Sequence, residues 1–217
     1  MNKIKYKLSH IFKKSQPTIT YLIIFACVFV WILQLLFPKF VYSTFAFVPF
    51  LALTHPWTFI TTGFLHATDP LTFFPVFPDF FHILFNMYSL YIVGTVLEPM
   101  FGRIRFSILY FLSLFASTLA VFITAMSSSD YANYFTITIG ASGAIFGLFG
   151  ALIFVFKRIG ANANPIMFVV GLNLLMPLFI SNLAWQAHIG GFIAGIIISF
   201  IMVDIIPKIR YHINRKE

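Results

Sequence analysis

The sequence predicts an all-α polytopic membrane protein in which six helices cross the bilayer. Of its 217 residues, 60% are hydrophobic and only 9% are charged, and the mean hydropathy of +0.94 is strongly positive. Apolar runs recur along most of the chain, which favours one bundle over a soluble domain with a single anchor. Backbone polar groups in hydrocarbon must be satisfied internally, so we expect these runs to be helices.

The net charge of +8 does not indicate nucleic-acid binding, because the basic residues are dispersed over the loops instead of forming a patch. Their distribution indicates the orientation of the chain in the membrane instead. Residues 1–17 are predicted to be a basic cytoplasmic arm beside anionic lipid. Residues 18–206 would form the membrane domain, and residues 207–217 a basic cytoplasmic tail. The single cysteine, Cys27, has no partner for an intrachain disulfide and is expected to pack within the first span.

The first apolar run, Thr18 to Phe37, is too long for a signal-peptide core and precedes no small-residue cleavage site, so we expect a retained span. From Pro38 to Phe80, further prolines interrupt the chain and no helix of spanning length fits. A long, membrane-embedded external loop is predicted there. Its Phe- and Pro-rich stretch from Phe73 to Phe81 is typical of an interfacial or re-entrant segment, and a partner surface is the alternative.

Five further runs complete the predicted spans. They are Phe81 to Met100, Phe106 to Met126, Ser142 to Phe156, Pro165 to Ser181 and Trp185 to Ile206. The fourth of the six spans is short for a hydrocarbon core of about 30 Å, so Ser142 at its start is expected to lie below the membrane surface.

Lys and Arg residues gather at alternate connections, as they do on the cytoplasmic side of membrane proteins. These are the N-terminal lysines, Arg103, Arg105, Lys157, Arg158 and the C-terminal basic cluster, whereas only Lys39 falls on the other side. Both termini are therefore expected in the cytoplasm. The basic arm without an organelle presequence favours the plasma membrane of a bacterium.

Four polar residues in the spans are candidates for chemistry, because burying such groups in hydrocarbon is costly unless they pair or react. They are Ser142, His188, His82 and Asn86. A spacing of four residues puts His82 and Asn86 on one helical face, and the predicted topology brings all four residues toward the outer leaflet. A hydroxyl, a base and hydrogen-bond donors are what hydrolysis of an amide requires.

Each candidate also has a purely structural interpretation. Ser142 follows Gly140 and precedes Gly143, as at an exposed nucleophile turn, but glycines at such spacing more often mark close helix packing. His188 alone would suit a proton relay or a ligand, and the pair in span two would suit interhelical hydrogen bonds. The occurrence of all four at one depth favours catalysis.

These residues resemble the rhomboid family of intramembrane serine proteases over about Trp57 to Asp204. The resemblance rests on His82-Ile83-Leu84-Phe85-Asn86, on Gly140-Ala141-Ser142-Gly143, and on Ala187-His188 followed by Gly191 and Gly195. It implies a six-helix rhomboid-like bundle with a dyad of Ser142 as nucleophile and His188 as general base. The oxyanion site would comprise His82, Asn86 and the Ser142 backbone N–H.

The resemblance also implies supporting roles for Gly140, Gly143 and Gly191, and an aromatic ring at Phe146 that stacks on His188. Two features depart from the family pattern. Trp57 precedes a threonine where the family often has an arginine that anchors the external loop. Glu98, followed later by Gly102 as in the family, lacks the common arginine two residues on, although Arg103 or Arg105 could reach it.

We predict a serine endopeptidase that cleaves membrane proteins within or near a transmembrane segment, with access beside span five, where Gly171, Asn173 and Pro177 indicate a less rigid helix. The alternatives are a non-proteolytic rhomboid-like protein that binds transmembrane clients and, ranked last, a small transporter. His55 and His66 have no carboxylate or thiol cluster beside them, so no metal is predicted. No soluble cofactor and no nucleic acid are expected; the partners are the bilayer and transmembrane substrates, and the oligomeric state stays open.

Overall fold

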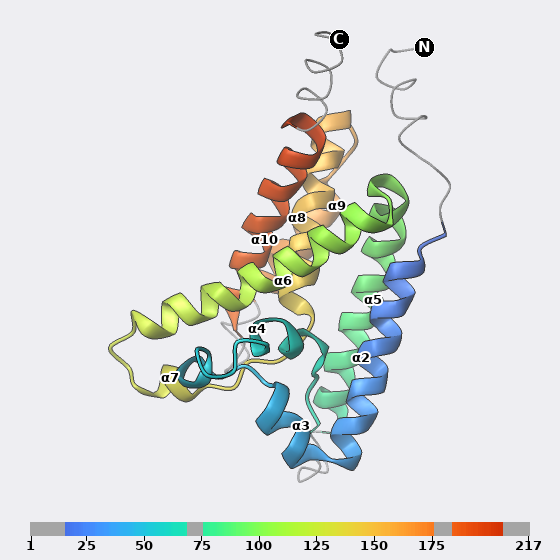
Figure 1. Cartoon of the computed structure of the whole chain (residues 1–217). Coiled ribbons are helices and arrows are strands. Elements are labelled where there is room, and N and C mark those ends of the chain that lie inside the picture. Colours follow the sequence, from blue (N-terminus) through green and yellow to red (C-terminus); the bar gives the residue numbers. More distant parts are fainter. Residues whose placement is uncertain (1–15, 69–75, 176–183, 206–217) are drawn as a thin grey trace, which may run out of the picture.

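The computed structural model describes residues 16–68, 76–175 and 184–205, which form an all-α bundle (Figure 1). The long helices are α2 (Thr18–Leu36), α5 (Val76–Phe101), α6 (Arg103–Met126), α8 (Ser142–Ile159), α9 (Asn164–Leu175) and α10 (Trp185–Phe200), the last continuing into a π-helical turn, Ile201–Ile205. The predicted fold class, an all-α polytopic membrane protein, is confirmed. Most of the predicted N-terminal arm and the whole C-terminal tail lie outside the described residues.

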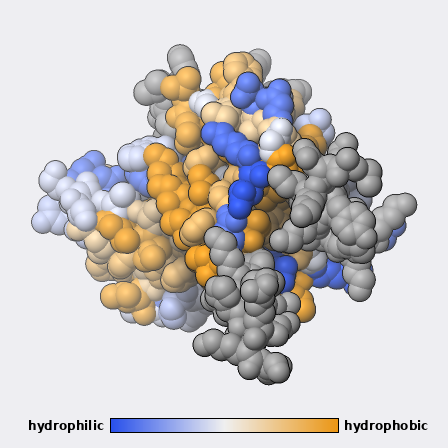
Figure 2. Space-filling model, turned by 90° about the horizontal axis from the view of Figure 1, so that it is seen from above, coloured by the Kyte–Doolittle hydropathy of each residue, from blue (hydrophilic) through white to orange (hydrophobic). Residues whose placement is uncertain are grey.

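Five helices are long and apolar enough to cross a membrane, namely α2, α5 from Phe80, α6, α8, and α10 with its π-helical turn. They correspond to five of the six predicted spans. The other prediction, Pro165 to Ser181, begins as α9 and continues beyond the described residues after Leu175. Large apolar side chains such as Phe25 and Ile193 are exposed, and hydrophobic residues make up much of the coloured surface seen from above, with hydrophilic residues between them (Figure 2).

Two helices extend beyond the spans predicted for them. Helix α5 begins at Val76, so the described part of the expected interfacial stretch is helical. Pro78 falls in the first turn of this helix, where a missing N–H removes no intrahelical bond. Helix α8 continues to Ile159, which places Lys157 and Arg158 in its last turn rather than in a loop. Cations at this position stabilise the helix because its C-terminal end carries the negative end of the helix dipole.

Between Pro38 and Thr68, the segment predicted to be an external loop contains only short helices: α3 (Pro38–Phe45), the 3-10 turns Pro49–Leu51 and Thr62–Phe64, and α4 (Thr58–Thr61). It docks without an arginine. Trp57 Nε1 donates to the Thr44 carbonyl at 2.8 Å, and Phe47 forms an isolated antiparallel bridge with Thr138. The Thr62 hydroxyl donates to the Thr138 carbonyl, so the loop is bound to the segment that leads into α8.

Glu98 caps helix α2 instead of pairing with an arginine. Its carboxylate is fully buried and accepts the backbone N–H groups of Ile19 at 2.9 Å and Thr20 at 2.8 Å. Helix α2 begins after Pro17, which offers no side-chain cap, so the carboxylate satisfies N–H groups that the helix leaves unpaired. Arg103, one of the two arginines that could have reached Glu98, instead donates to the Thr18 hydroxyl at 2.7 Å.

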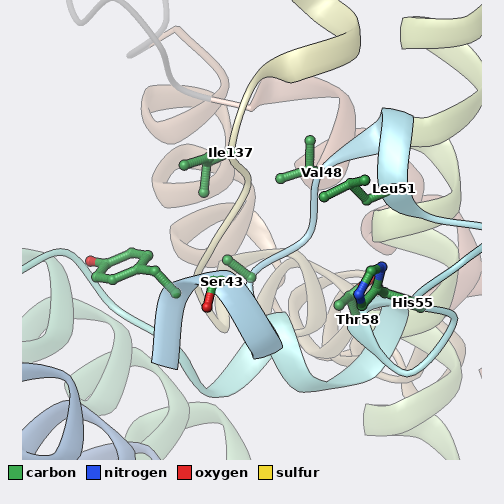
Figure 3. Close-up of a pocket in the computed structure, with 8 residues that line it drawn as sticks. Ser43, Val48, Leu51, His55, Thr58 and Ile137 are labelled. Carbon is green, nitrogen blue, oxygen red and sulfur yellow. The ribbon is translucent and has the colours of Figure 1, made fainter. Parts of the chain in front are cut away.

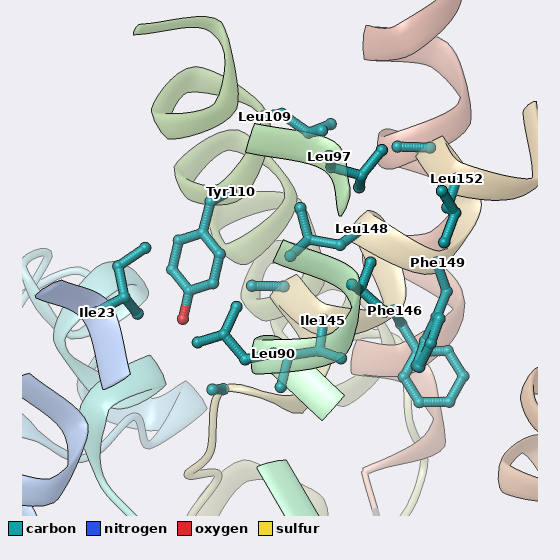
Figure 4. Packing of buried hydrophobic residues seen from close by; sticks show 14 of the residues in the cluster. Ile23, Leu90, Leu97, Leu109, Tyr110, Ile145, Phe146, Leu148, Phe149 and Leu152 are labelled. Atoms are coloured by element: carbon teal, nitrogen blue, oxygen red, sulfur yellow. The ribbon is translucent and has the colours of Figure 1, made fainter. Parts of the chain in front are cut away.

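Helix α8 is the centre of the bundle. It packs between α6 and α10 and also contacts α5 and α9, and its buried side chains join those of α5 and α6 in one apolar cluster (Figure 4). Ile145, Leu148 and Leu152 belong to this cluster. In Figure 1 the first turn of α8 lies level with α4, within the bundle rather than at its outer end.

Candidate active site

The side chains of Ser142 and His188 meet within the bundle, although 46 residues separate them. Ser142 is the first residue of α8, and His188 lies in the first turn of α10. The distance from Ser142 Oγ to His188 Nε2 is 3.0 Å, a normal hydrogen bond. When the imidazole carries its proton on Nδ1, the serine hydroxyl donates to Nε2, which is the arrangement of a nucleophile and its general base.

Four glycines allow α8 and α10 to approach closely enough for this contact. A Cβ atom on Gly191 would collide with the Gly143 carbonyl, and one on Gly195 would collide with the Gly147 carbonyl. The opposite sides of Gly143 and Gly147 face Ser117 and Ser113 of α6. The proximity of Ser142 and His188 therefore depends on this close packing, because larger residues at the glycine positions would push α10, and His188 with it, away from α8.

Phe146 lies one turn after Ser142 and stacks on His188. The ring centroids are 4.1 Å apart, and the planes differ by 4°. His188 is buried, and its Nδ1 has no hydrogen-bond partner within the described part of the chain. The ring is oriented by aromatic packing on α8, in place of the carboxylate that orients the histidine of a catalytic triad.

His82 and Asn86 of α5 lie beside the segment before Ser142. A Cβ atom on Gly140 would be 3.1 Å from His82 Nε2, which places that nitrogen against the backbone two residues before the serine. Gly140 has a φ of +119°, where residues with a side chain are strained. Asn86 is buried and its amide donates to the His82 carbonyl at 2.7 Å, so in this conformation the amide is turned toward its own helix.

The Ser142 N–H is at the first position of α8, where no carbonyl lies one turn back to accept it within the helix. The positive end of the α8 dipole is directed toward the same place. Together with His82, this end of the helix supplies donors suited to a developing negative charge.

His55 and His66 lie apart from each other in the external loop. His55 contacts Thr54 and the Trp57 ring and lines a hollow of about 190 Å³ between loop segments (Figure 3). Neither Ser142 nor His188 lines that hollow. His66 is fully buried and packs beside His82 with ring centroids 5.3 Å apart. Burial, and secondarily the nearby His82, lower the pKa of His66 to about 3, so it is neutral at physiological pH.

Two residues near the candidate site were not predicted from the sequence. Ala67 donates its backbone N–H to His82 Nδ1 at 3.3 Å, and Gln34 of α2 binds the peptide groups of His66. The one available signal was Gln34 itself, an amide in an otherwise apolar predicted span. An alanine backbone carries no sequence signal.

Comparison with known proteins gives a consistent result. A family model described as the rhomboid domain matches residues 53–205. "Putative rhomboid protease YdcA" of Bacillus subtilis (strain 168) is 32% identical over 153 residues, which cover 68% of each chain. "RHOMBOID-like protein 1" of Arabidopsis thaliana is 31% identical over 74% of this chain and 38% of its own length. "Rhomboid protease GluP" of Bacillus subtilis is 34% identical over 52% of this chain and 22% of its own.

Proposed function

This chain belongs to the rhomboid family, and on that premise we propose that it is an intramembrane serine endopeptidase that hydrolyses peptide bonds within or near transmembrane segments of membrane proteins. The observation that carries the proposal is the 3.0 Å contact between Ser142 Oγ and His188 Nε2 inside a membrane-spanning bundle. Family membership and the relatives named as proteases support protease activity in general. The dyad, the oxyanion site and the choice of substrate are parts of the proposal.

In the proposed reaction, Ser142 Oγ attacks the carbonyl carbon of the scissile peptide while its proton passes to His188 Nε2. His188 then donates that proton to the departing amine as the C–N bond breaks, which leaves an ester on Ser142. Water then attacks the ester carbonyl while His188 takes one of its protons. The bond between the acyl carbon and Ser142 Oγ breaks, His188 returns the proton to Ser142 Oγ, and the carboxyl product leaves. The stack on Phe146 holds the imidazole in position through both steps.

The negative oxygen formed in each attack would be bound by the Ser142 N–H, His82 and Asn86. His82 Nε2 already faces Gly140. Asn86 must release the His82 carbonyl to donate to the oxyanion, a rotation of one side chain whose present bond is 2.7 Å long. In a soluble serine protease one such donor contributes about 3 to 4 kcal/mol to transition-state stabilisation.

The substrate is proposed to approach beside α9. This helix packs mainly against α8, and large apolar side chains, Phe168 and Leu172 among them, are exposed on it. A transmembrane substrate would have to unwind locally to present its scissile amide, because a helical backbone is hydrogen-bonded to itself. Water would enter from the side of α3, which in the proposed orientation faces away from the cytoplasm of a bacterial plasma membrane.

The test compares purified wild type with Ser142→Ala and His188→Ala in liposomes, against a panel of single-span substrates. Cleavage by the wild type alone supports the proposal, and cleavage that persists in Ser142→Ala excludes the dyad. A matched control is Ser107→Ala, which removes an exposed hydroxyl of α6 bonded only within its helix and should leave cleavage unchanged. A wild type that binds panel members without cutting any of them would instead favour a client-binding protein. Such a protein does not require Ser142 and His188 to react.

A further inference from the structure

The backbone of the external loop selects one tautomer of His82. The Ala67 N–H donates to His82 Nδ1 at 3.3 Å, and a backbone N–H can only donate. His82 Nδ1 must therefore present a lone pair, so the neutral ring carries its proton on Nε2. A proton on Nδ1 would place two N–H groups against each other.

The selected proton is on the nitrogen that faces Gly140. His82 Nε2 lies against Gly140, where a Cβ atom would be 3.1 Å away, and Gly140 is two residues before Ser142. With the other tautomer, Nε2 would present a lone pair to this place and would repel a developing oxyanion. The usefulness of His82 as a donor thus depends on where the Ala67 N–H is held.

Helix α2 holds that peptide. Gln34 Nε2 donates to the His66 carbonyl at 2.8 Å, and Gln34 Oε1 accepts the His66 N–H at 3.0 Å. Trp31, one turn earlier, donates from Nε1 to the Ala67 carbonyl at 3.1 Å. The Gln34 side chain is fully buried, and both its nitrogen and its oxygen bond the backbone of His66.

We propose that Gln34 and Trp31 of α2 are positioning residues for the oxyanion site, because they fix the 66–67 peptides so that Ala67 holds His82 as an Nε2–H donor. Neither residue touches the reacting atoms. The inference rests on the proposed function for the identity of the group that His82 stabilises, whereas the tautomer is a property of the protein with or without a substrate.

The experiment is nitrogen NMR of protein labelled with ¹⁵N-histidine, with the His82 signals identified by their loss in His82→Gln. The wild type is expected to show a protonated Nε2 and an unprotonated Nδ1 for His82. In Gln34→Leu, and in Trp31→Phe as a second variant that keeps an aromatic ring, a second population with protonated Nδ1 should appear. Thr61→Val is the matched control, because it removes a different anchor of the same loop, the 2.8 Å bond to the Phe45 carbonyl, and should leave the His82 signals unchanged.

Cleavage assays on the same variants distinguish positioning from loop anchoring. We expect kcat to fall by roughly 10- to 100-fold in Gln34→Leu with KM within about twofold of wild type, the pattern of a displaced transition-state donor. An unchanged His82 tautomer in both variants, or an Nδ1–H tautomer in the wild type, would overturn the inference. A shift of tautomer in a protein that cleaves no substrate supports the positioning of His82 and overturns only the proposed function.

Discussion

The rings of Phe146 and His188 lie parallel with their centroids 4.1 Å apart. They come from α8 and α10, the two helices that the glycine contacts draw together. The stack fixes the imidazole plane while Nε2 contacts Ser142 Oγ. A histidine that no carboxylate orients in the described structure is thereby held by packing.

Replacing Phe146 by leucine should lower kcat by about tenfold, since an aromatic pair contributes roughly 0.5 to 1.5 kcal/mol beyond its buried area. Phe146→Tyr keeps the ring and should retain most of the turnover. Phe154→Leu on the same helix loses a ring contact with Phe200 far from His188 and serves as the control. Equal losses in Phe146→Leu and Phe154→Leu would show that the stack has no special part in catalysis.

Asn86→Ala should reduce kcat by about 100- to 1,000-fold, the effect of removing one oxyanion donor. Its effect on folding should be limited to about 1 kcal/mol, because the amide makes one hydrogen bond to the His82 carbonyl. Steady-state cleavage and reversible unfolding in mixed micelles measure the two effects separately. A variant that loses stability in proportion to its activity would assign Asn86 to structure.

Gly195→Ala should destabilise the bundle by about 1 to 3 kcal/mol, because the added Cβ collides with the Gly147 peptide and two packed helices must separate. The same displacement would move His188 from Ser142, so activity should fall as well. Gly171→Ala of α9 adds a Cβ where no atom lies within 4 Å and should be neutral or slightly stabilising. Unfolding free energies of the two variants test this difference in stability. Equal values for Gly195→Ala and Gly171→Ala would show that α10 tolerates the methyl group and contradict the prediction.

Glu98→Gln should lower the unfolding free energy by about 1.5 to 3 kcal/mol, the range for hydrogen bonds to a charged group. The carboxylate accepts two N–H groups and the Thr20 hydroxyl, whereas an amide would present a donor to one of them. Arg103→Ala loses only an exposed bond to Thr18 and should change stability by less than about 0.5 kcal/mol. If Arg103→Ala were as destabilising as Glu98→Gln, an arginine contact would be the important one after all.

The protein should lose stability on mild acidification, and His66 should account for part of that loss. Burial holds the pKa of His66 at about 3, below its ordinary 6.5, so between these values the unfolded chain binds a proton that the folded protein excludes. Stability is fully present above pH 6.5 and declines as pH falls toward 3, by about 2 kcal/mol at pH 5.

Unfolding free energies of wild type and His66→Gln between pH 7.5 and pH 4.5 test this expectation. The difference between the two proteins isolates His66 from other titrating groups. The wild type should show the steeper decline with falling pH. Parallel curves would mean that His66 is already protonated, or remains accessible to protons, in the folded state.

Local patterns in the sequence determined the fold class and most of the spans. Hydropathy is a property of consecutive residues, so five spans in the described chain correspond to predicted ones, and residues 38–68 of the proline-rich loop contain no helix of spanning length. The same reasoning misjudged helix ends, where Val76 begins α5 two residues before a proline and Lys157 continues α8. A first turn tolerates proline and a last turn favours cations, and neither exception is visible in an average over a window.

Residue types in the sequence also indicated which side chains are candidates for chemistry, but only the tertiary structure decided how they meet. Ser142 and His188 are brought together by α8 and α10 packing on shared glycines. Glu98 caps α2 from 78 residues away, and Gln34 reaches the loop that orients His82. These contacts join polar groups across helices, where each buried donor or acceptor must find a partner. Which partner it finds depends on helix packing, a property that no local pattern contains.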